Sequence, residues 1–320
     1  MPSQEPLFSF ILPAYKAQFL QEAIESILNQ TYQNLELVIV DDASPEDLKS
    51  IVNTFSDTRI RYYRNEQNIG GTDLVKQWNH CLTFAQGDYV ILAADDDVYN
   101  KDFLSEAVAL FAKYPEVQLL RARTQSIDEN GSVLDIDIKC AEYMEFGDFL
   151  LLRGKIHAGI GNYVFKRSKL YETKFISFPL AWWSDWATAY EHALKGVIYT
   201  QKILFSFRSS GSRVSSQHDK KNILQKIVAT KSFFSWLMTK LDEAKQLNPM
   251  DIRLDVMYHF FFQANHLCFM DIVLLMSYLG GWNFWWVLFK IKKMKIISRR
   301  EFIKLIYFQF NHAFVKIFSR

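Results

Sequence analysis

The chain has 320 residues, of which 49% are hydrophobic, and this excludes a disordered protein and allows one large domain or two modest ones. The 27 Phe, 15 Tyr and 8 Trp are many for a soluble protein, so part of the aromatic surface is expected to face lipid. The formal net charge is +2, but residues 290–320 carry nine Lys and Arg against one acid, a net +8 that leaves −6 for the remainder. The net negative charge of residues 1–289 argues against a nucleic-acid binder. The basic residues of 290–320 are interleaved with aromatic residues, which favours binding to a membrane surface.

The cysteines and the first residues indicate a compartment. Cys81, Cys140 and Cys268 are widely spaced and form no CxxC or Cys/His cluster, which favours a reducing environment and no structural zinc. Residues 1–6 lack the basic stretch and following apolar run of a secretion signal. We therefore expect a cytoplasmic protein.

The first 123 residues alternate between short apolar runs and amphipathic segments. Leu7–Leu12, closed by Pro13, and Leu35–Val40, closed by Asp41 and Asp42, are predicted to be buried parallel strands. Between them, apolar residues recur at helical spacing over residues 19–28. The same patterns predict helices over residues 46–55, 74–84 and 103–111, and strands over residues 59–64, 89–94 and 117–123. This alternation predicts an open α/β sheet covered by helices.

Three adjacent carboxylates, Asp95, Asp96 and Asp97, follow the predicted strand 89–94. An isolated acidic triplet is more often a solvated turn. In open α/β sheets, however, ligands bind at the carboxyl ends of strands, where Pro13–Tyr15 and Asp41–Asp42 also fall. Carboxylate oxygens suit Mg²⁺ or Mn²⁺ and, through the metal, phosphates. The three segments together predict a nucleotide-diphosphate site, although Asp41 and Asp42 alone would equally serve as helix caps.

Six segments follow one another in a characteristic order: Ile11–Tyr15, Val38–Ser44, Asn68–Gly70, Trp78–Asn79, Ala85–Val90 and Leu92–Asp97. Their order and spacing resemble the inverting family-2 glycosyltransferases, whose catalytic domain has the GT-A fold, a Rossmann-like, mostly parallel sheet with flanking helices. The resemblance covers about residues 6–215 and implies a catalytic domain of residues 1–215, followed by a helical, membrane-associating region of residues 216–320.

The resemblance implies roles for matching positions. A divalent cation, Mn²⁺ or Mg²⁺, would bind at the acidic triplet. The family's metal-binding motif, DxD, is an acid, a spacer and a second acid, and a proline usually follows it. If Lys101 takes the place of that proline, the motif is Ala94–Asp96, so Asp96 is the metal ligand and Ala94 replaces an acid. If the triplet Asp95–Asp97 is itself the motif, Asp97 is the ligand. The residues implied to bind the nucleotide sugar are Pro13, Ala14, Tyr15, Asp41, Asp42, Asn68, Gly70, Asp95, Asp96 and Arg208.

Inverting transfer also needs a base that takes the proton of the attacking hydroxyl. Asp185 resembles the base position of the family's Glu-Asp motif, with Ser184 in place of the glutamate. The alternative is that Ser184 or Asp185 caps the helix predicted over residues 187–195. Nearby tryptophans at 182, 183 and 186 offer faces for an acceptor sugar, or belong to the core.

The segment Phe207–Ser212 resembles the family's flexible stretch over the diphosphate, with Ser210 where a histidine is usual. Arg208 and Arg213 would then be cationic partners of the leaving diphosphate. His157 and His192 show no metal-ligand spacing and are interpreted as ordinary polar residues, with His157 a minor candidate for the acceptor side.

Beyond residue 215 the composition predicts helices over residues 223–241 and 253–270, and then 18 residues without a charge, Ile272–Phe289. As one helix this run would span about 27 Å, the lower limit for crossing a bilayer. Ser277, Gly280–Gly281 and Asn283 interrupt it, which favours a shallow interfacial segment over a crossing, with a buried helical hairpin as the third possibility. Residues 290–320 would lie on the cytoplasmic lipid face.

With the resemblance, these observations predict a metal-dependent, inverting, hexosyl-type glycosyltransferase. It would move a sugar from a nucleotide-diphosphate donor, UDP-type, to a hydroxyl of a lipid-linked or growing glycan in surface polysaccharide or lipopolysaccharide assembly. It would be peripheral or monotopic on the inner face of the plasma membrane. The alternatives are a non-catalytic membrane-associated nucleotide-sugar-binding protein and a sugar-phosphate nucleotidyltransferase, whose usual glycine-rich loop is replaced here by Pro13–Lys16.

Overall fold

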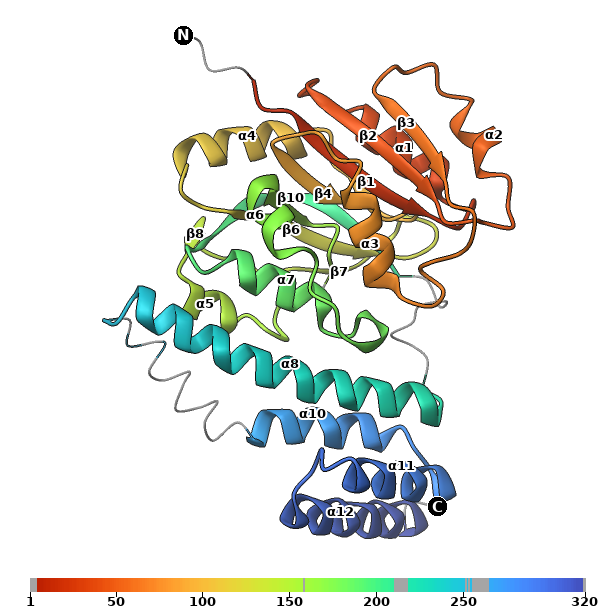
Figure 1. The fold of residues 1–320 in the computed structure, drawn as a ribbon, viewed down its shortest axis with the longest axis vertical. Helices are drawn as coiled ribbons and strands as arrows, with labels where there is room; N and C mark the ends of the chain where they lie inside the picture. The colour runs from red at the N-terminus through yellow and green to blue at the C-terminus, as the bar shows by residue number, and fades with distance from the viewer. Residues whose placement is uncertain are drawn as a thin grey trace. The chain divides into compact units, whose positions relative to one another are not determined.

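The computed structural model describes residues 5–157, 159–209, 218–250, 252, 254 and 265–318. The chain forms two compact units (Figure 1). The first comprises Met1–Ser177 and Ser184–Gly211, and the second comprises Phe178–Trp183 and Ser212–Arg320. A six-residue segment that lies just before Ser184 in sequence therefore groups with the C-terminal helices.

A mixed sheet forms the centre of the first unit, with strand order β3-β2-β1-β4-β9-β6-β10-β5 in the described part of the chain. The pairs β3–β2, β2–β1, β1–β4 and β6–β10 are parallel, while β9 runs antiparallel to both β4 and β6. β7 and β8 pair at the side with β6 and β10. The strands are β1 (Phe8–Ala14), β2 (Leu35–Asp41), β3 (Ile60–Arg64), β4 (Tyr89–Leu92), β5 (Val98–Tyr99), β6 (Leu119–Ile127), β7 (Val133–Ile136), β8 (Tyr143–Met144), β9 (Tyr163–Lys166) and β10 (Val197–Arg208).

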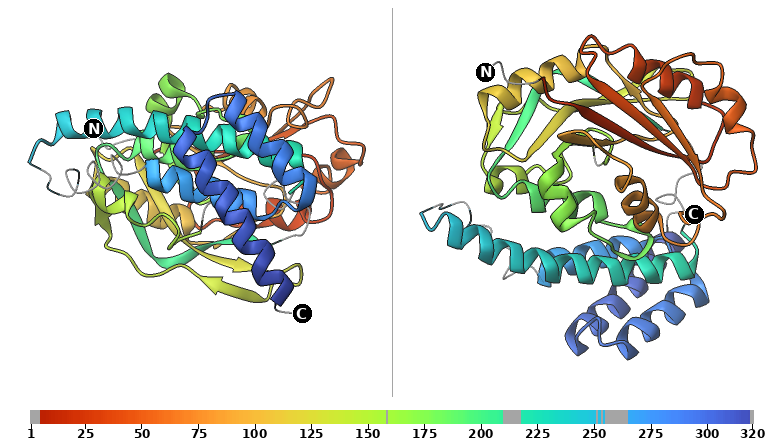
Figure 2. Two further views of the ribbon diagram at one scale, coloured as in Figure 1. Left: turned by 90° about the horizontal axis from the view of Figure 1, so that it is seen from below. Right: turned by 45° about the horizontal axis from the view of Figure 1, so that its top comes forward.

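Helices cover both faces of this sheet (Figure 2). On one face, alternate residues of β1 and β2 share a core with the apolar stripe of the first helix, whose buried positions follow the spacing i, i+3, i+4, i+7. On the other face, Trp78 and Phe165 both pack edge-on against Phe175. The helices of this unit are α1 (Leu20–Leu28), α2 (Leu48–Val52), α3 (Leu74–Leu82), α4 (Phe103–Lys113), α5 (Phe146–Leu150), α6 (Arg167–Thr173) and α7 (Ser184–His192).

The predicted strands and helices before residue 123 are all present, with shifted ends. The sequence-based prediction that Pro13 closes the first strand is wrong, because β1 continues to Ala14 and pairs Pro13 with Val40. Pro13 lies beyond the last β1–β4 pair, Ile11 with Leu92, so its missing N–H removes no bond from that ladder.

The second unit is helical in the described residues. It contains α8 (Lys220–Leu247), α10 (Asn265–Ser277), α11 (Gly281–Lys293) and α12 (Arg299–Phe318), together with the short 3-10 helix Pro179–Ala181. α8 packs against α10 and α11, and α11 packs against α12 (Figure 2). Most of the helix predicted over residues 253–270 lies outside the described residues.

The uncharged run over residues 272–289 is not one helix. It is divided between α10, which ends at Ser277, and α11, which begins at Gly281. Within the part of the chain that the structure describes, no helix has the length and apolar character needed to cross a bilayer.

Candidate active site

Three of the predicted site segments meet at the carboxyl ends of β1, β2 and β4. The register pairs Ala14 with Asp41, and Ala93 donates its backbone N–H to Ile11 O, so the loops that follow the three strands are neighbours. The Asp95 carboxylate accepts hydrogen bonds from the backbone N–H groups of Tyr15, at 2.9 Å, and Lys16, at 2.8 Å. The Tyr15 side chain is 41% exposed and offers an aromatic face at this edge.

The three acids of the triplet have different environments. Burial raises the pKa of Asp95 above its ordinary value, although the two amide bonds oppose this. Asp97 is buried, and its Oδ1 accepts the backbone N–H of Arg208 at 3.0 Å. Asp95 therefore binds the loop after β1 and Asp97 binds the end of β10. Asp96, between them, is half-buried.

Arg208 lies in the site but is buried in the protein. Its Nε donates to Asp96 O at 2.9 Å, its Nη1 to the backbone oxygens of Asp128 and Glu129, and its Nη2 to Glu22 Oε2 at 2.6 Å. The guanidinium also stacks on the Phe19 ring at 4.2 Å. The side chain is 1% exposed, so in this structure it holds the backbone of the acidic turn rather than facing a phosphate.

The carboxylates of Asp41 and Asp42 also accept hydrogen bonds from groups of the protein. Asp41 accepts from Ser44 N, from the Tyr62 hydroxyl and from Arg64, with which it forms an ion pair. Burial, followed by the bond to Asp41, raises the pKa of Tyr62 to about 12. These carboxylates shape the loops at the end of β2; whether either contacts a nucleotide stays a prediction.

Asn68 and Gly70 lie in the loop that Asp42 organises. Asp42 accepts the backbone N–H groups of Ile69 and Gly70 at 2.8 and 2.7 Å, and Asn68 Oδ1 accepts from Gly71 N at 2.5 Å. A Cβ on Gly70 would lie 2.9 Å from Asp42 Oδ2. This close approach explains a glycine at position 70.

Asp185 lies in the first turn of α7, directly after the buried Ser184. Its Oδ1 accepts the backbone N–H of Trp186 at 2.8 Å. Burial raises the pKa of Asp185 to about 6, against the opposing effect of that amide. A carboxylate with a raised pKa is a stronger base than an ordinary one, which suits proton abstraction near neutral pH.

The tryptophans near Asp185 have structural contacts. Trp186 is buried beside Tyr190, with ring centroids 5.4 Å apart. In the second unit, Trp182 and Trp183 both donate from Nε1 to Thr230 Oγ1, at 3.2 and 3.0 Å, and Trp183 stacks on Phe233 of α8. The contacts therefore favour the core interpretation over stacking on an acceptor.

Sequence reasoning missed a buried charge network next to this region. Arg121 and Asp137 form a fully buried ion pair at 2.7 Å, with Arg121 lying over the rings of Tyr163 and Tyr199. His157 approaches the same carboxylate, with Nδ1 2.7 Å from Asp137 Oδ1. Arg121 is a charged residue inside the strand predicted over residues 117–123, which indicates a buried ion pair, but the sequence alone does not show that Asp137 is its partner.

His192 is structural. Its Nδ1 lies 2.8 Å from Thr188 O, and burial lowers its pKa to about 4, so the ring is neutral. Ser210 and Arg213, predicted for the segment over the diphosphate, lie outside the described residues. No group of three or more His, Cys, Asp or Glu side chains among the described residues is arranged to hold a metal by itself.

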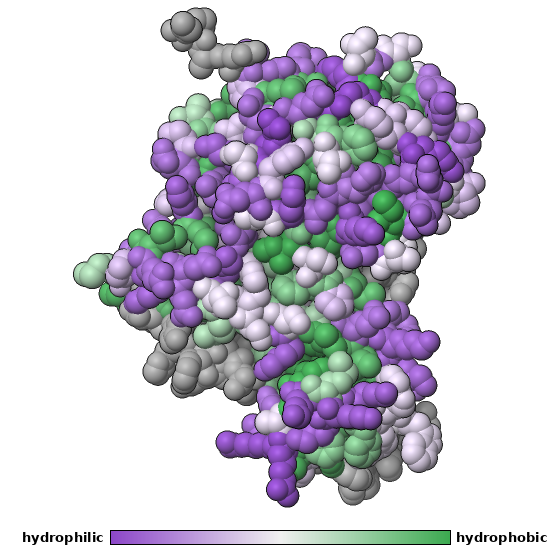
Figure 3. All heavy atoms as spheres, in the orientation of Figure 1, coloured by the Kyte–Doolittle hydropathy of each residue, from purple (hydrophilic) through white to green (hydrophobic). Residues whose placement is uncertain are grey.

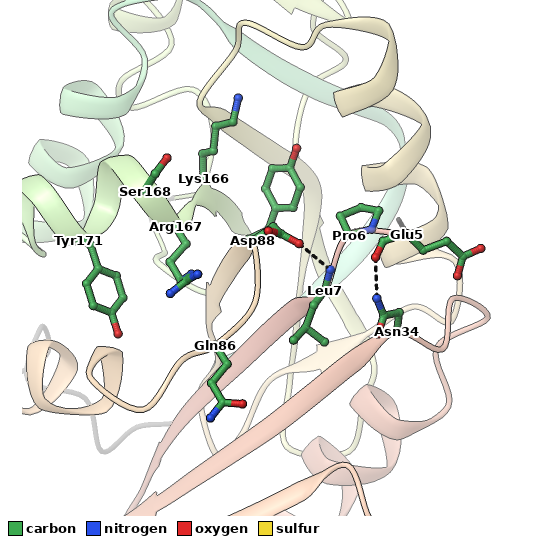
Figure 4. Close-up of a pocket in the computed structure, with 11 residues that line it drawn as sticks. Glu5, Pro6, Leu7, Asn34, Gln86, Asp88, Lys166, Arg167, Ser168 and Tyr171 are labelled. Carbon is green, nitrogen blue, oxygen red and sulfur yellow. Dashed lines mark hydrogen bonds between the residues drawn. The ribbon is translucent and has the colours of Figure 1, made fainter. Parts of the chain in front are cut away.

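A separate hollow of about 930 Å³ lies at the opposite, amino ends of β1 and β4 (Figure 4). Leu7, Asp88, Lys166 and Arg167 are among its lining residues, and Asp88 accepts the backbone N–H of Leu7 at 2.9 Å. None of the predicted site residues lines it. It is therefore distinct from the site at the carboxyl edge.

A mostly parallel α/β sheet with helices on both faces is the architecture of the GT-A fold, which glycosyltransferases have. A model of the family described as glycosyl transferase family 2 matches residues 9–173, just over half of the chain. The chain belongs to this family, which confirms the resemblance.

The chain is similar to curated glycosyltransferases in sequence and to a solved structure in fold. The chain is 34% identical over 130 residues to the putative glycosyltransferase EpsE of Bacillus subtilis, covering 39% of this chain and 46% of EpsE. It is 37% identical over 107 residues to the putative colanic acid biosynthesis glycosyl transferase WcaA of Escherichia coli, covering 32% and 37%. The match thus spans less than half of these relatives. The S. aureus TarS fragment 1–349, solved with UDP-GlcNAc, is similar in fold, with a TM-score of 0.59 at 16% identity over 93% of this chain and 89% of that one.

Proposed function

We propose that this glycosyltransferase transfers a hexosyl-type sugar, with inversion, from a nucleotide-diphosphate sugar to a hydroxyl acceptor. The observation that carries the proposal is the acidic turn. Backbone N–H groups of the loop after β1 bind the Asp95 carboxylate and that of Arg208, at the end of β10, binds Asp97, so Asp96 is held at the carboxyl edge of β4. A preorganised carboxylate at this edge is what a cation-bridged diphosphate requires.

The donor is a UDP-sugar in this proposal. TarS, which has a similar fold, has been solved with UDP and with UDP-GlcNAc. In the present chain the exposed Tyr15 ring offers a stacking surface for a base, next to the loops that Asp41 and Asp42 organise. Pro13, Ala14, Asn68 and Gly70 line the same edge in the proposal.

Mn²⁺ or Mg²⁺ fits the donor set. The available ligands are hard carboxylate oxygens, and Mg²⁺ commonly binds one or two carboxylates together with substrate phosphates and water. We prefer Asp96 as the ligand because Asp97 bonds the Arg208 backbone and is buried; Asp97 is the second choice. When bound, the cation neutralises charge on the departing diphosphate. Arg208 then acts by positioning the turn.

Asp185 is the proposed base. Its carboxylate accepts the proton of the acceptor hydroxyl as the new glycosidic bond forms and the bond to the diphosphate breaks. The raised pKa places the ionised and protonated forms close in free energy near neutral pH, which is the condition for efficient proton transfer.

The proposed acceptor is a lipid-linked or growing glycan, and the proposed place of work is the cytoplasmic membrane face, as in assembly of surface polysaccharide or lipopolysaccharide. The net +8 of residues 290–320 supports this placement, because anionic lipids attract such segments.

The test is a screen of nucleotide sugars with Mn²⁺ or Mg²⁺, measuring release of nucleoside diphosphate and the shift in melting temperature. We expect at least one donor to be bound and turned over only with metal. Asp96→Asn should lose both effects, whereas Glu116→Gln is the matched charge control, because Glu116 is an exposed acid between α4 and β6. Donor binding without release under every condition would indicate a binding protein, and pyrophosphate as product would indicate a nucleotidyltransferase; either contradicts the proposal.

A further inference from the structure

Helix α11 has two apolar faces, and only one of them is covered. Its buried residues, Phe284, Val287, Leu288 and Ile291, are spaced i, i+3, i+4, i+7 and pack inside the second unit. Trp282, Trp286 and Phe289, at i, i+4 and i+7, lie elsewhere on the helix and are 88%, 36% and 59% exposed. We call these three residues the aromatic row.

Cations flank the aromatic row. Lys290 Nζ lies 5.6 Å from the Trp286 ring, and Lys220 Nζ, from the start of α8, lies 5.4 Å from the same ring. The last turn of α11 also carries Lys292 and Lys293. Large aromatic residues beside lysines are typical of surfaces at the boundary between lipid and water, where the ring enters the interface and the ammonium group stays with the phosphates.

The row is continuous with the next helix. Phe289 contacts Phe302 of α12, with ring centroids 5.8 Å apart. The exposed residues Arg299, Arg300 and Lys304 are in the same helix. Figure 3 shows hydrophobic and strongly hydrophilic side chains next to each other on this part of the second unit. Glu301, which accepts the backbone N–H of Ser298, is the one acid among residues 290–320, against nine Lys and Arg, so this stretch is predominantly cationic.

We propose that the aromatic row, with Lys220 and Lys290, docks on the headgroup layer of an anionic bilayer, with α11 parallel to the membrane plane. The inference rests on the proposed membrane placement and names the surface and the lipid charge. The charge of this surface favours a bilayer over a second copy of the chain. In a two-fold dimer the lysine-rich patch of one copy would lie against the same patch of the other, and the positive charges would repel each other. Anionic headgroups complement these lysines.

The test is flotation of the full chain with vesicles of phosphatidylcholine alone, or mixed with phosphatidylglycerol. We expect binding to the mixed vesicles, weakened by salt, and a blue shift of tryptophan fluorescence. Trp282→Ser with Phe289→Ser should weaken binding by roughly tenfold or more, since two large apolar groups are lost. Lys290→Gln with Lys293→Gln should remove most of the preference for anionic vesicles.

Leu134→Ser is the matched control, because Leu134 is an apolar residue on β7 of the first unit that is as exposed as Phe289. Circular dichroism and nucleoside diphosphate release establish that each variant is folded. Binding of the double aromatic variant at the wild-type level would overturn the proposal, as would a wild-type dimer that this variant abolishes. A chain that binds vesicles but releases no diphosphate contradicts the proposed function alone; the reverse result contradicts only this inference.

Discussion

Asp185→Asn tests the base directly, because the asparagine keeps the size of the side chain and cannot accept the proton. With a pKa of about 6, the wild-type carboxylate is about nine-tenths ionised at pH 7 and about one-tenth ionised at pH 5. The transfer rate under saturating donor should therefore fall about tenfold between these pH values. A carboxyl group with an ordinary pKa of 3.8 would remain almost fully ionised over the same range. Asp185→Asn should lose about a hundredfold or more at pH 7 and keep no such pH dependence.

The same raised pKa predicts a gain in stability for the variant. Asp185 has a higher pKa in the folded chain than its ordinary value of 3.8, so its ionised form is disfavoured by folding. The shift corresponds to up to about 3 kcal/mol above pH 6. This penalty decreases as the pH falls from 6 towards 3.8, because the folded state takes up the proton first. Asp185→Asn should thus unfold at higher urea concentration than the wild type at pH 8, with the difference lost near pH 4.

The assay is nucleoside diphosphate release in single-turnover mode from pH 5 to pH 8, with donor affinity measured separately by the shift in melting temperature. Donor affinity should change little in the variant, because Asp185 takes no part in holding the diphosphate. Normal transfer by Asp185→Asn, or a wild-type rate that is flat from pH 5 to pH 7, would refute the reasoning.

Asp97→Asn should destabilise the fold by about 1–3 kcal/mol in urea unfolding, because the buried Arg208 N–H loses a charged acceptor. Asp96→Asn should abolish metal-dependent release, and release at the wild-type rate by this variant would contradict the assignment of the ligand. Arg208→Met should lower the free energy of unfolding by about 2–4 kcal/mol and weaken metal affinity, since the acidic turn loses its support. Arg121→Met should cost about 3–5 kcal/mol, because it leaves the Asp137 carboxylate buried and unpaired. Burial alone would raise the pKa of Asp137, but bonds from His157 and Arg121 lower it to about 2, so the stability it contributes above about pH 4 should be lost as the pH falls towards 2 in acid titration of the wild type.

The strands that position the site were predictable because nearly all of their residues are apolar. β1, β2 and β4 are largely buried, so each appears as a hydrophobic run; the polar residues inside these runs are Ser9 in β1 and Glu36 in β2, and polar residues come at or after the carboxyl ends. That pattern predicts Asp41, Asp42 and the acidic triplet at one edge of the sheet.

What the sequence left open depends on contacts between distant segments. β10 contains Gln201 and Lys202 between its apolar residues, so its pattern does not indicate a twelve-residue strand. Without β10, the partner of Asp97 and the burial of Arg208 cannot be predicted, and Arg208 was expected to face a phosphate. The tryptophans at 182 and 183 were ambiguous for the same reason, because their partner Thr230 is on another helix.

The bonds of Arg208 have a consequence for how the enzyme is made. Its partners Asp96 and Glu22 precede it by 112 and 186 residues. At translation speeds of about 5–20 residues per second, the acidic turn leaves the ribosome roughly 5–20 s before the guanidinium that secures it. A nascent chain stopped at residue 173, where the family match ends, would already contain the three acids and the Tyr15 and Lys16 amides that bind Asp95, but not Arg208. The contacts that hold the acidic turn are thus completed only when the end of β10 has been synthesised.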